Sequence, residues 1–229
     1  MVHRVLVVAL ATVAFAAPAS AAATDGKPRL PDAEIFTTNN TAVIADPDDP
    51  RLRVPLIGFA REVERIVRAG GGTPRGSQLL DGVFFSSDLG TTTFERSRDF
   101  DVDHVTDDEL EAIAQTVRGR FQQESVLTFD YLPRAGDEVD AVELEVPGVT
   151  AQALRDGLLA DQAARERLFG GSVTLDGHLL LIAALEDAEL ARTFAVRIGG
   201  DVAQAAIRYG EREFVEAPAA QLEHRQAIG

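Results

Sequence analysis

The sequence predicts an α+β fold, in which an antiparallel sheet carries its helices on one face. Two observations lead to this prediction. Apolar residues recur at helical spacing in some segments and alternate with polar ones in others. From Gly82 to Leu185 these segments follow the order strand, helix, strand, strand, helix, strand, with an extra hairpin strand after the first. Because this is the split βαβ order, we expect a ferredoxin-like core at about 82–185, with extra elements at both ends.

The amino terminus has the pattern of a cleavable export signal. Met1 to Arg4 carries a positive charge, and Val5 to Ala17 is an apolar run too short to remain as a membrane span. Pro18 then precedes the small residues Ala19-Ser20-Ala21, which suit a signal peptidase. We therefore predict a signal peptide at 1–21 and a secreted, extracellular protein. The alternative is an amino-terminal helix buried in the domain, although core helices rarely lack a polar face.

A flexible leader is expected at 22–32, where glycine, proline and charge occur without an apolar period. A single domain is expected at 33–215. Alternation, helical spacing and turn residues predict its first elements. These are a hairpin of strands at 34–38 and 41–44, a helix over 56–67 that stops at three glycines, and a second pair of strands at 79–85 and 91–94.

The helix that follows Thr106 has the clearest start signal. Thr106-Asp107-Asp108-Glu109 is a capping box, in which the first and last side chains satisfy backbone N–H groups of the first turn. An apolar stripe then continues to Phe121. The remaining elements are predicted, in order, as strands at 125–132 and 139–146, a helix over 150–169, a buried strand segment over 172–185, a helix over 186–196, a strand over 205–215 and a loosely held tail at 216–229.

Composition and missing motifs exclude several classes of function. The chain has 37 acidic and 22 basic residues, a formal net charge of −15, so nucleic acid and anionic lipid are not expected partners. It has no cysteine, which removes thiol catalysis and disulfides. No segment after the signal is long enough to span a membrane. The HExxH, P-loop, GxGxxG and GxSxG patterns are absent.

Side-chain alternation gathers a histidine and several carboxylates on one face of the predicted sheet. The helices are expected to cover the face that carries Phe129, while Glu143, Glu145, Asp176 and His178 share the opposite, open face. A histidine beside carboxylates can act as a general base. These four residues are therefore candidate catalytic residues. The alternative is an ordinary solvated sheet surface in an acidic protein.

Asp99, Asp101 and Asp103 place three carboxylates at alternate positions and are candidate metal ligands. An EF-hand loop that began at Asp99 would need glycine and glutamate where His104 and Leu110 stand, so the match to that motif fails. No cofactor is expected from the sequence, and weak calcium binding at these three residues is the one alternative that the pattern leaves open. The alternative is a set of acidic residues that favours a helix amino terminus through the helix dipole.

Three functional interpretations remain open from the sequence alone. The leading one is a secreted, non-catalytic module that binds a small ligand or a protein through an open sheet face. The rival is a secreted hydrolase or lyase that uses a histidine with acidic partners, with or without a metal. A structural protein of the cell surface is the third, and it would need an exposed apolar patch. No complete catalytic motif is present, which favours binding over an enzyme.

Overall fold

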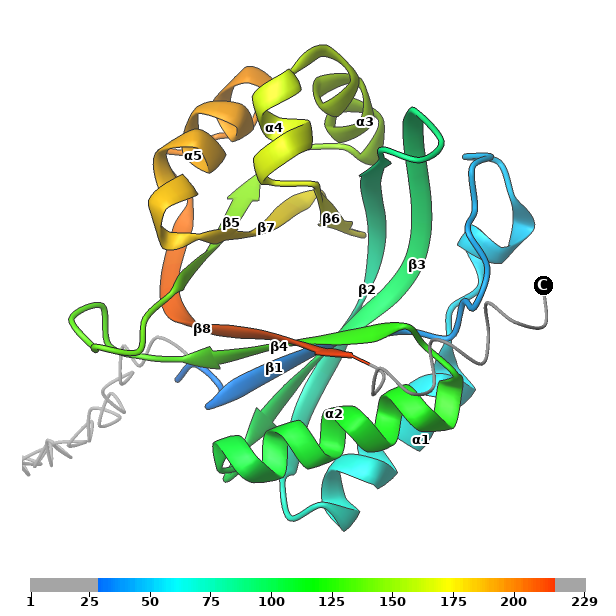
Figure 1. Ribbon diagram of the computed structural model, residues 1–229, viewed down its shortest axis with the longest axis vertical. Coiled ribbons are helices and arrows are strands. Elements are labelled where there is room, and N and C mark those ends of the chain that lie inside the picture. The colour runs from blue at the N-terminus through cyan, green and yellow to red at the C-terminus, as the bar shows by residue number, and fades with distance from the viewer. Residues whose placement is uncertain (1–28, 217–229) are drawn as a thin grey trace, which may run out of the picture.

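The computed structural model describes residues 29–216, whose strands close into a single eight-stranded antiparallel barrel (Figure 1). Neighbouring strands follow the order β1-β3-β2-β6-β7-β5-β8-β4, and β4 pairs with β1 to complete the ring. The strands are β1 (Ala33–Thr38), β2 (Thr73–Ser86), β3 (Thr91–Asp103), β4 (Ser125–Tyr131), β5 (Ala141–Pro147), β6 (Gly170–Thr174), β7 (His178–Ala184) and β8 (Ala206–Glu216).

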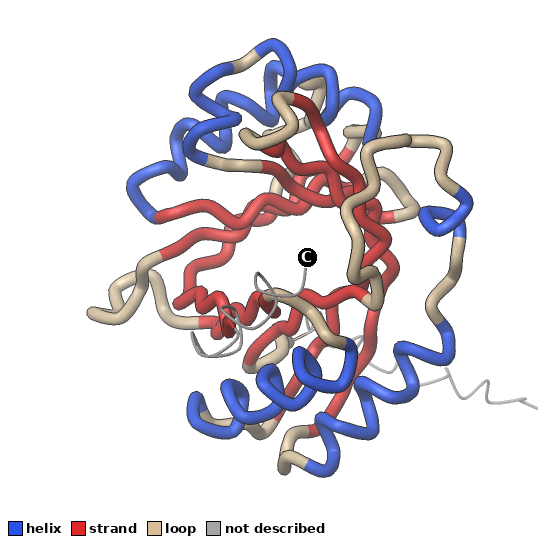
Figure 2. Tube along the Cα trace, turned by 45° about the vertical axis from the view of Figure 1, so that its right-hand side comes forward, coloured by secondary structure: helices blue, strands red, loops and turns tan. Residues whose placement is uncertain are grey.

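The helices lie outside the barrel, in two groups on opposite sides (Figures 1 and 2). One group holds α1 (Ile57–Ala69) and α2 (Asp107–Phe121). The other holds α3 (Ala151–Ala160), α4 (Gln162–Arg167) and α5 (Ala188–Arg197). Two short 3₁₀ turns, at Pro50–Arg53 and Leu185–Asp187, complete the described elements.

The described chain contains the same order of elements twice. β1 to β4 and β5 to β8 each run strand, helix, strand, strand, helix, strand, with α3 and α4 together in the place of a single first helix in the second half. Within each half the spatial order is fourth, first, third, second strand. The halves join through the pairs β2–β6 and β4–β8. Each half therefore supplies one curved half of the barrel wall.

Two separate apolar clusters hold the helices against the barrel wall. In the first half, Phe59 on α1 packs edge-on against Phe100 on β3 and against Phe121 on α2, with ring centroids 6.1 and 4.6 Å apart. In the second half, Leu154 on α3 and Phe194 on α5 are fully buried, where α3 packs on β2 and β6 and α5 packs on β5 and β7. The apolar side chains of these two clusters mark the outward face of each strand, and the alternate side chains face the lumen.

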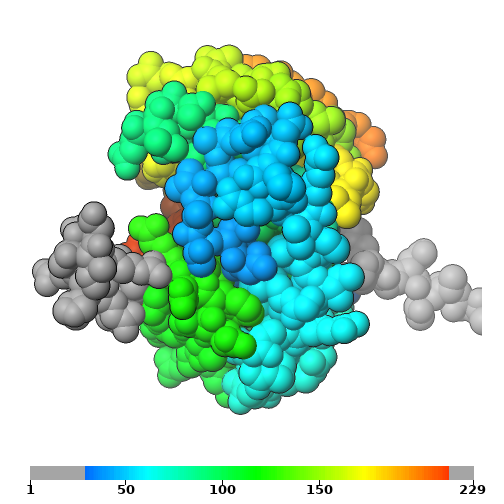
Figure 3. All heavy atoms as spheres, turned by 90° about the vertical axis from the view of Figure 1, so that its right-hand side faces the viewer, coloured from blue at the N-terminus to red at the C-terminus, as the bar shows by residue number. Residues whose placement is uncertain are grey.

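The connection between β1 and α1 crosses the outer surface of β3. Its carbonyl groups at Val54 and Pro55 accept hydrogen bonds from Arg96 and Arg98 on that strand. Ile44 forms one isolated bridge with Phe94. The segment covers this side of the molecule, as the blue residues in Figure 3 show. These contacts protect the backbone of a strand pair that would otherwise face solvent.

The predicted ferredoxin-like sheet with one open face is wrong, because the sheet closes on itself. The range 82–185 begins inside β2 and ends after β7, so it joins pieces of both halves. The predicted hairpin of 34–38 with 41–44 is also absent. Both edges of β1 are already paired, with β3 and β4, which leaves no edge for a hairpin partner.

The predicted signal peptide at 1–21, most of the leader at 22–32 and all of the tail after residue 216 lie outside the described residues. Between residues 29 and 216, no helix combines the length and the apolar character needed to cross a membrane.

Candidate functional site

The barrel lumen is the candidate site, because it collects the polar side chains that the helices do not cover. In a closed sheet every second side chain of a strand points inward. Cross-strand register and the two outer clusters assign the inward positions. They include Glu34, Phe36, Phe84, Glu95, Ser97, Asp99, Asp101, Leu127, Phe129, Tyr131, Glu143, Glu145, Leu180, Ile182, Arg208, Arg212 and Phe214.

One end of the lumen is filled by a hydrogen-bonded network around Glu143, which is only 1% exposed. The Tyr131 hydroxyl donates to the Glu143 carboxylate over 2.6 Å. Arg208 donates to the same carboxylate and, over 2.7 Å, to Glu145. The negative field of Glu143 and Glu145 raises the pKa of Arg208, against the effect of its burial, and holds it charged. This end is a satisfied structural network.

Two further carboxyls in this network have raised pKa values. Burial raises the pKa of Glu34 well above its usual range, and the neighbouring carboxylates of Glu143 and Asp99 raise it further. Burial also raises the pKa of Asp99 to about 6, although Gln78 donates to it from its backbone and side-chain nitrogens over 2.9 and 2.8 Å. A protonated Glu34 can donate to Tyr131 while Tyr131 donates to Glu143, so each polar group in this row has a partner.

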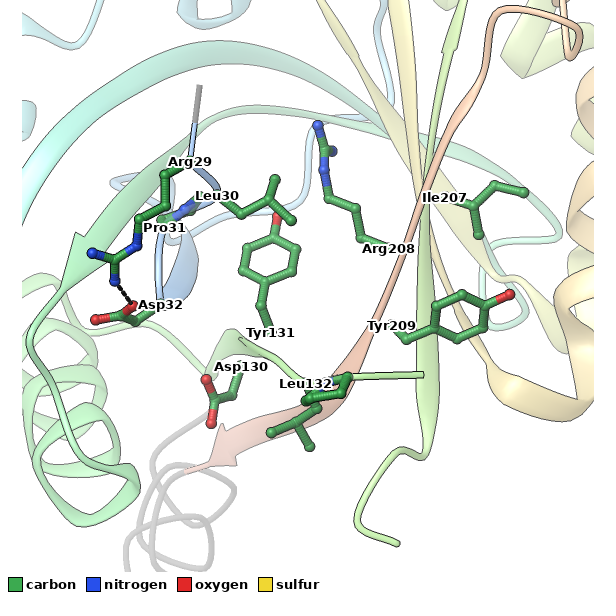
Figure 4. A pocket seen from close by; sticks show the side chains of 11 residues that line it. Arg29, Leu30, Pro31, Asp32, Asp130, Tyr131, Leu132, Ile207, Arg208 and Tyr209 are labelled. Atoms are coloured by element: carbon green, nitrogen blue, oxygen red, sulfur yellow. Dashed lines mark hydrogen bonds and ion pairs between the residues drawn. The ribbon is translucent and has the colours of Figure 1, made fainter. Parts of the chain in front are cut away.

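An open depression of about 630 Å³ lies over this end of the barrel (Figure 4). Tyr131 and Arg208 line it from the strands. Arg29 and Asp32, joined by an ion pair of 2.5 Å, line it from the segment before β1. Because its inner side chains are already engaged in the network, this depression offers a ligand few free polar groups.

The other end of the lumen contains a cavity of about 460 Å³. Its walls come from β1, β2, β3, β4, β6, β7 and β8. They are mainly apolar, and the lumen side chains among the apolar lining residues include Phe36, Phe84, Leu127, Ile182 and Phe214. A cavity of this size with a few polar groups on apolar walls is typical of small-molecule sites.

Glu95 is the acidic group of this cavity. Burial raises its pKa to about 7, and a hydrogen bond with Ser97 opposes that rise. It also borders a smaller, more polar cavity of about 290 Å³. Asn40 lines that second cavity, and its side-chain nitrogen is buried without a hydrogen-bond partner among residues 29–216. Glu95 therefore links two cavities and stays partly protonated near neutral pH.

Arg212 is the basic group of the main cavity, and Phe169 lies at its rim. No hydrogen bond or ion pair joins the Arg212 guanidinium to another residue of the described chain, although its backbone N–H donates to Asp140 over 3.0 Å. Phe169 is 63% exposed and has a φ of 61°, a conformation that costs a bulky residue about 1 kcal/mol or more. Such strain is a recurrent feature of ligand sites.

The four candidate catalytic residues fall into two groups. His178 and Asp176 form a pair of 3.1 Å, Nδ1 to Oδ2, at the turn between β6 and β7. Glu143 and Glu145 point into the lumen and bind Arg208. No hydrogen bond or ion pair within 29–216 joins the two groups. The face predicted for Glu143 and Glu145 is the lumen wall. Phe129, which was predicted to lie on the opposite face under the helices, also points into the lumen.

The three candidate metal ligands lie along β3 and have separate partners. Asp99 accepts hydrogen bonds from Gln78, and Asp103 lies 3.6 Å from Arg75 and accepts from the Asp32 backbone N–H. Burial raises the pKa of Asp101, and the charge of Arg75 opposes that rise. Between residues 29 and 216, no group of three or more His, Asp or Glu side chains has an arrangement suited to a metal ion.

Sequence reasoning did not select Glu95, Arg212 or Phe169. Alternation could have indicated Glu95, because β3 carries polar side chains at every second position from Glu95 to Asp103. The candidate metal ligands proposed from the sequence begin only at Asp99. Arg212 had no comparable signal, since it lies among alternating charges in a strand that looks exposed on both faces.

Comparison with known proteins gives no assignment. No protein-family model matches the sequence, and no curated protein sequence matches it. One similar solved structure is described as that of a major regulator of staphylococcal pathogenesis. The alignment covers 78% of this chain and 98% of that one, at 11% identity and a TM-score of 0.24. Likeness at that level carries no argument about fold or function.

Proposed function

We propose that this protein is a non-catalytic binding protein that takes up a small, largely apolar molecule inside its barrel. The observation that carries the proposal is the 460 Å³ cavity at one end of the lumen. The cavity opens to solvent at its rim, and a concave, mainly apolar hollow of this size is the usual form of a small-molecule site. Here the opposite end of the same lumen is filled by the network around Glu143, so the cavity is a local feature of one end.

The lining of the cavity supports a ligand better than a water-filled gap. Aromatic side chains from three strands, Phe36, Phe84 and Phe214, border it. Phe214 remains 55% exposed, an unusual state for a phenylalanine that points into a barrel. A bound apolar molecule would remove this surface from water, at about 25 cal/mol per Å². In this proposal the protein acts outside the cell, as its amino-terminal sequence predicts.

The enzyme alternative has less support from the geometry. His178 has an acidic partner in Asp176, but that pair lies at an exposed turn, where the Asp176 side chain is 72% accessible. Glu143 and Glu145, the other predicted partners, are occupied by Arg208. A hydrolase or lyase centred on His178 would need further groups that these contacts do not supply.

The proposal is tested by blocking the cavity. Ile182→Trp places a larger side chain on its wall, and Leu175→Trp makes the same kind of change at a 69% exposed position outside the lumen. Decanol should raise the melting temperature of the wild type and of Leu175→Trp, because a ligand that binds only the folded state stabilises it. It should not raise that of Ile182→Trp. Equal shifts in all three proteins, or no shift in any, would refute binding in the cavity.

A further inference from the structure

Resting on the proposed function, we infer that the ligand is an amphipathic anion, a carboxylate with an apolar chain, whose charged group pairs with Arg212. The chain would lie against Phe36, Leu127 and the other apolar walls of the same cavity. The proposal deepens the binding function by naming the chemical class of the ligand and the residue that selects it.

The Arg212 side chain has no hydrogen bond or ion pair within 29–216, in contrast to three other inward or buried arginines. Arg208 binds two carboxylates in the lumen. Arg96 on β3 binds Asp81 and the Val54 carbonyl. Arg118 on α2 donates to Gln115 and to the Gln123 carbonyl. The Nε of Arg155 on α3 is also buried without a partner, but Arg155 does not line the cavity, whereas the partly buried Arg212 does.

A guanidinium on an apolar wall favours a specific kind of ligand group. Its planar set of N–H donors matches the two oxygens of a carboxylate, and such charge-assisted hydrogen bonds are stronger than neutral ones. An apolar ligand without a charge would remove water from the guanidinium and leave it unpaired. The cavity should therefore favour an acid over an alcohol of the same chain length.

Glu95, the other ionisable group of the cavity, does not reverse this preference. Its pKa of about 7 leaves a large fraction neutral at pH 6 to 7, whereas arginine keeps its charge throughout that range. The fixed charge on the cavity wall is thus positive near and below neutral pH. That sign is opposite to the net charge of the chain, −15, so the local preference is a property of the cavity and not of the whole surface.

Calorimetric titration of the protein with decanoate, decanol and decylammonium at pH 6.5 tests the inference. The matched variants are Arg212→Gln and Arg61→Gln. Arg61 is an exposed arginine on the outside of α1, and its replacement removes the same charge away from the lumen. Wild type and Arg61→Gln should bind decanoate roughly 10-fold or more tighter than decanol, as expected for one charge-assisted contact. Arg212→Gln should bind the two equally while keeping its affinity for decanol.

Every other outcome of these titrations would refute either the inference or the proposed function. Equal affinities for decanoate and decanol in the wild type, tightest binding of decylammonium, or an intact decanoate preference in Arg212→Gln would refute the inference and leave the binding function standing. Failure of the wild type to bind any of the three probes would refute the proposed function, and the inference with it. Comparing the melting temperatures of the variants without ligand shows that each is folded.

Discussion

At the scale of single residues, the lumen is distinguished by carboxyl groups whose pKa values are raised. Burial is the largest cause for Glu34, Glu95 and Asp99 alike. Arg208 pairs with Glu143 and Glu145, whereas no ion pair within 29–216 involves Glu34, Glu95 or Asp99. The protein avoids the cost of several buried negative charges by retaining protons, and it satisfies the ionised groups through Tyr131 and Arg208.

This pattern predicts that the folded state loses stability as the pH rises. A carboxyl with a raised pKa keeps its proton in the folded state at pH values where the unfolded chain releases it. The folded state then binds more protons between about pH 4 and 7, so the free energy of unfolding should fall from pH 5 to pH 8. Glu95 alone, with a pKa of about 7, should contribute up to about 3 kcal/mol of that fall.

Urea unfolding at a series of pH values measures this effect. Glu95→Gln removes the titrating proton, so it should flatten the pH dependence and be more stable than the wild type at pH 8. Glu62→Gln is the matched control, because hydrogen bonds from Arg65 and Arg120 hold the pKa of that partly buried carboxyl at about 2, outside the range studied. If the free energy of unfolding depends on pH in the same way in wild type and Glu95→Gln, Glu95 is not protonated near neutral pH in the folded state.

At the scale of elements, local sequence signals located most of the helices. The capping box forms as predicted, with Glu109 N–H donating to the Thr106 hydroxyl and Thr106 N–H donating to the Glu109 carboxylate. The apolar stripe predicted over 56–67 faces the core as α1. The capping box and the apolar stripe depend only on residues that lie within a few helical turns of one another in the sequence. The region predicted as one helix over 150–169 instead divides at Asp161, whose side chain caps α4 and binds Arg197.

Strand partners were harder to predict than strands. The two segments predicted at 125–132 and 139–146 are indeed strands, yet β8 lies between them and pairs with both. Alternation also assigned Glu143 and His178 to one face correctly and Phe129 to the wrong one. A period of two sorts each strand into two faces, but which face meets a helix depends on partners far away in the sequence.

Two helical glycines give a prediction at this scale. Gly157 on α3 packs so closely on Ile198 and Phe194 of the α5 region that a Cβ would overlap them, whereas Gly119 on α2 has open space around its Cα. Gly119→Ala should stabilise the protein by about 0.5–1 kcal/mol through helix propensity. Gly157→Ala should destabilise it by about 1–3 kcal/mol through overpacking.

Thermal or urea unfolding of the two variants checks the predicted gain in stability for one and the predicted loss for the other. The two substitutions are chemically identical and both lie inside helices, so propensity alone predicts the same stabilisation for each. Stabilisation by both would contradict the close packing of α3 against α5.

At the scale of the whole molecule, the sequence predicts the class of elements but not the closure of the sheet. The element order repeats from one half to the other, although the two halves show no convincing sequence repeat. Closure depends on the pairs β2–β6 and β4–β8, which join strands widely separated along the chain and leave no local pattern. The cavity exists only because of closure, since its walls come from both halves, and that is why Glu95 and Arg212 could not be brought together from the sequence.

The central claim is that the lumen is a ligand site, and a tryptophan reporter tests it most directly, because the chain has no tryptophan of its own. Phe36→Trp places the reporter on the cavity wall, and Tyr209→Trp places one on the outer side of β8, in contact with the helix-facing cluster. Titration with decanoate should shift the emission of Phe36→Trp to shorter wavelength in a saturable manner and leave that of Tyr209→Trp unchanged. An unchanged spectrum for Phe36→Trp, or equal shifts for both reporters, would contradict ligand binding inside the barrel.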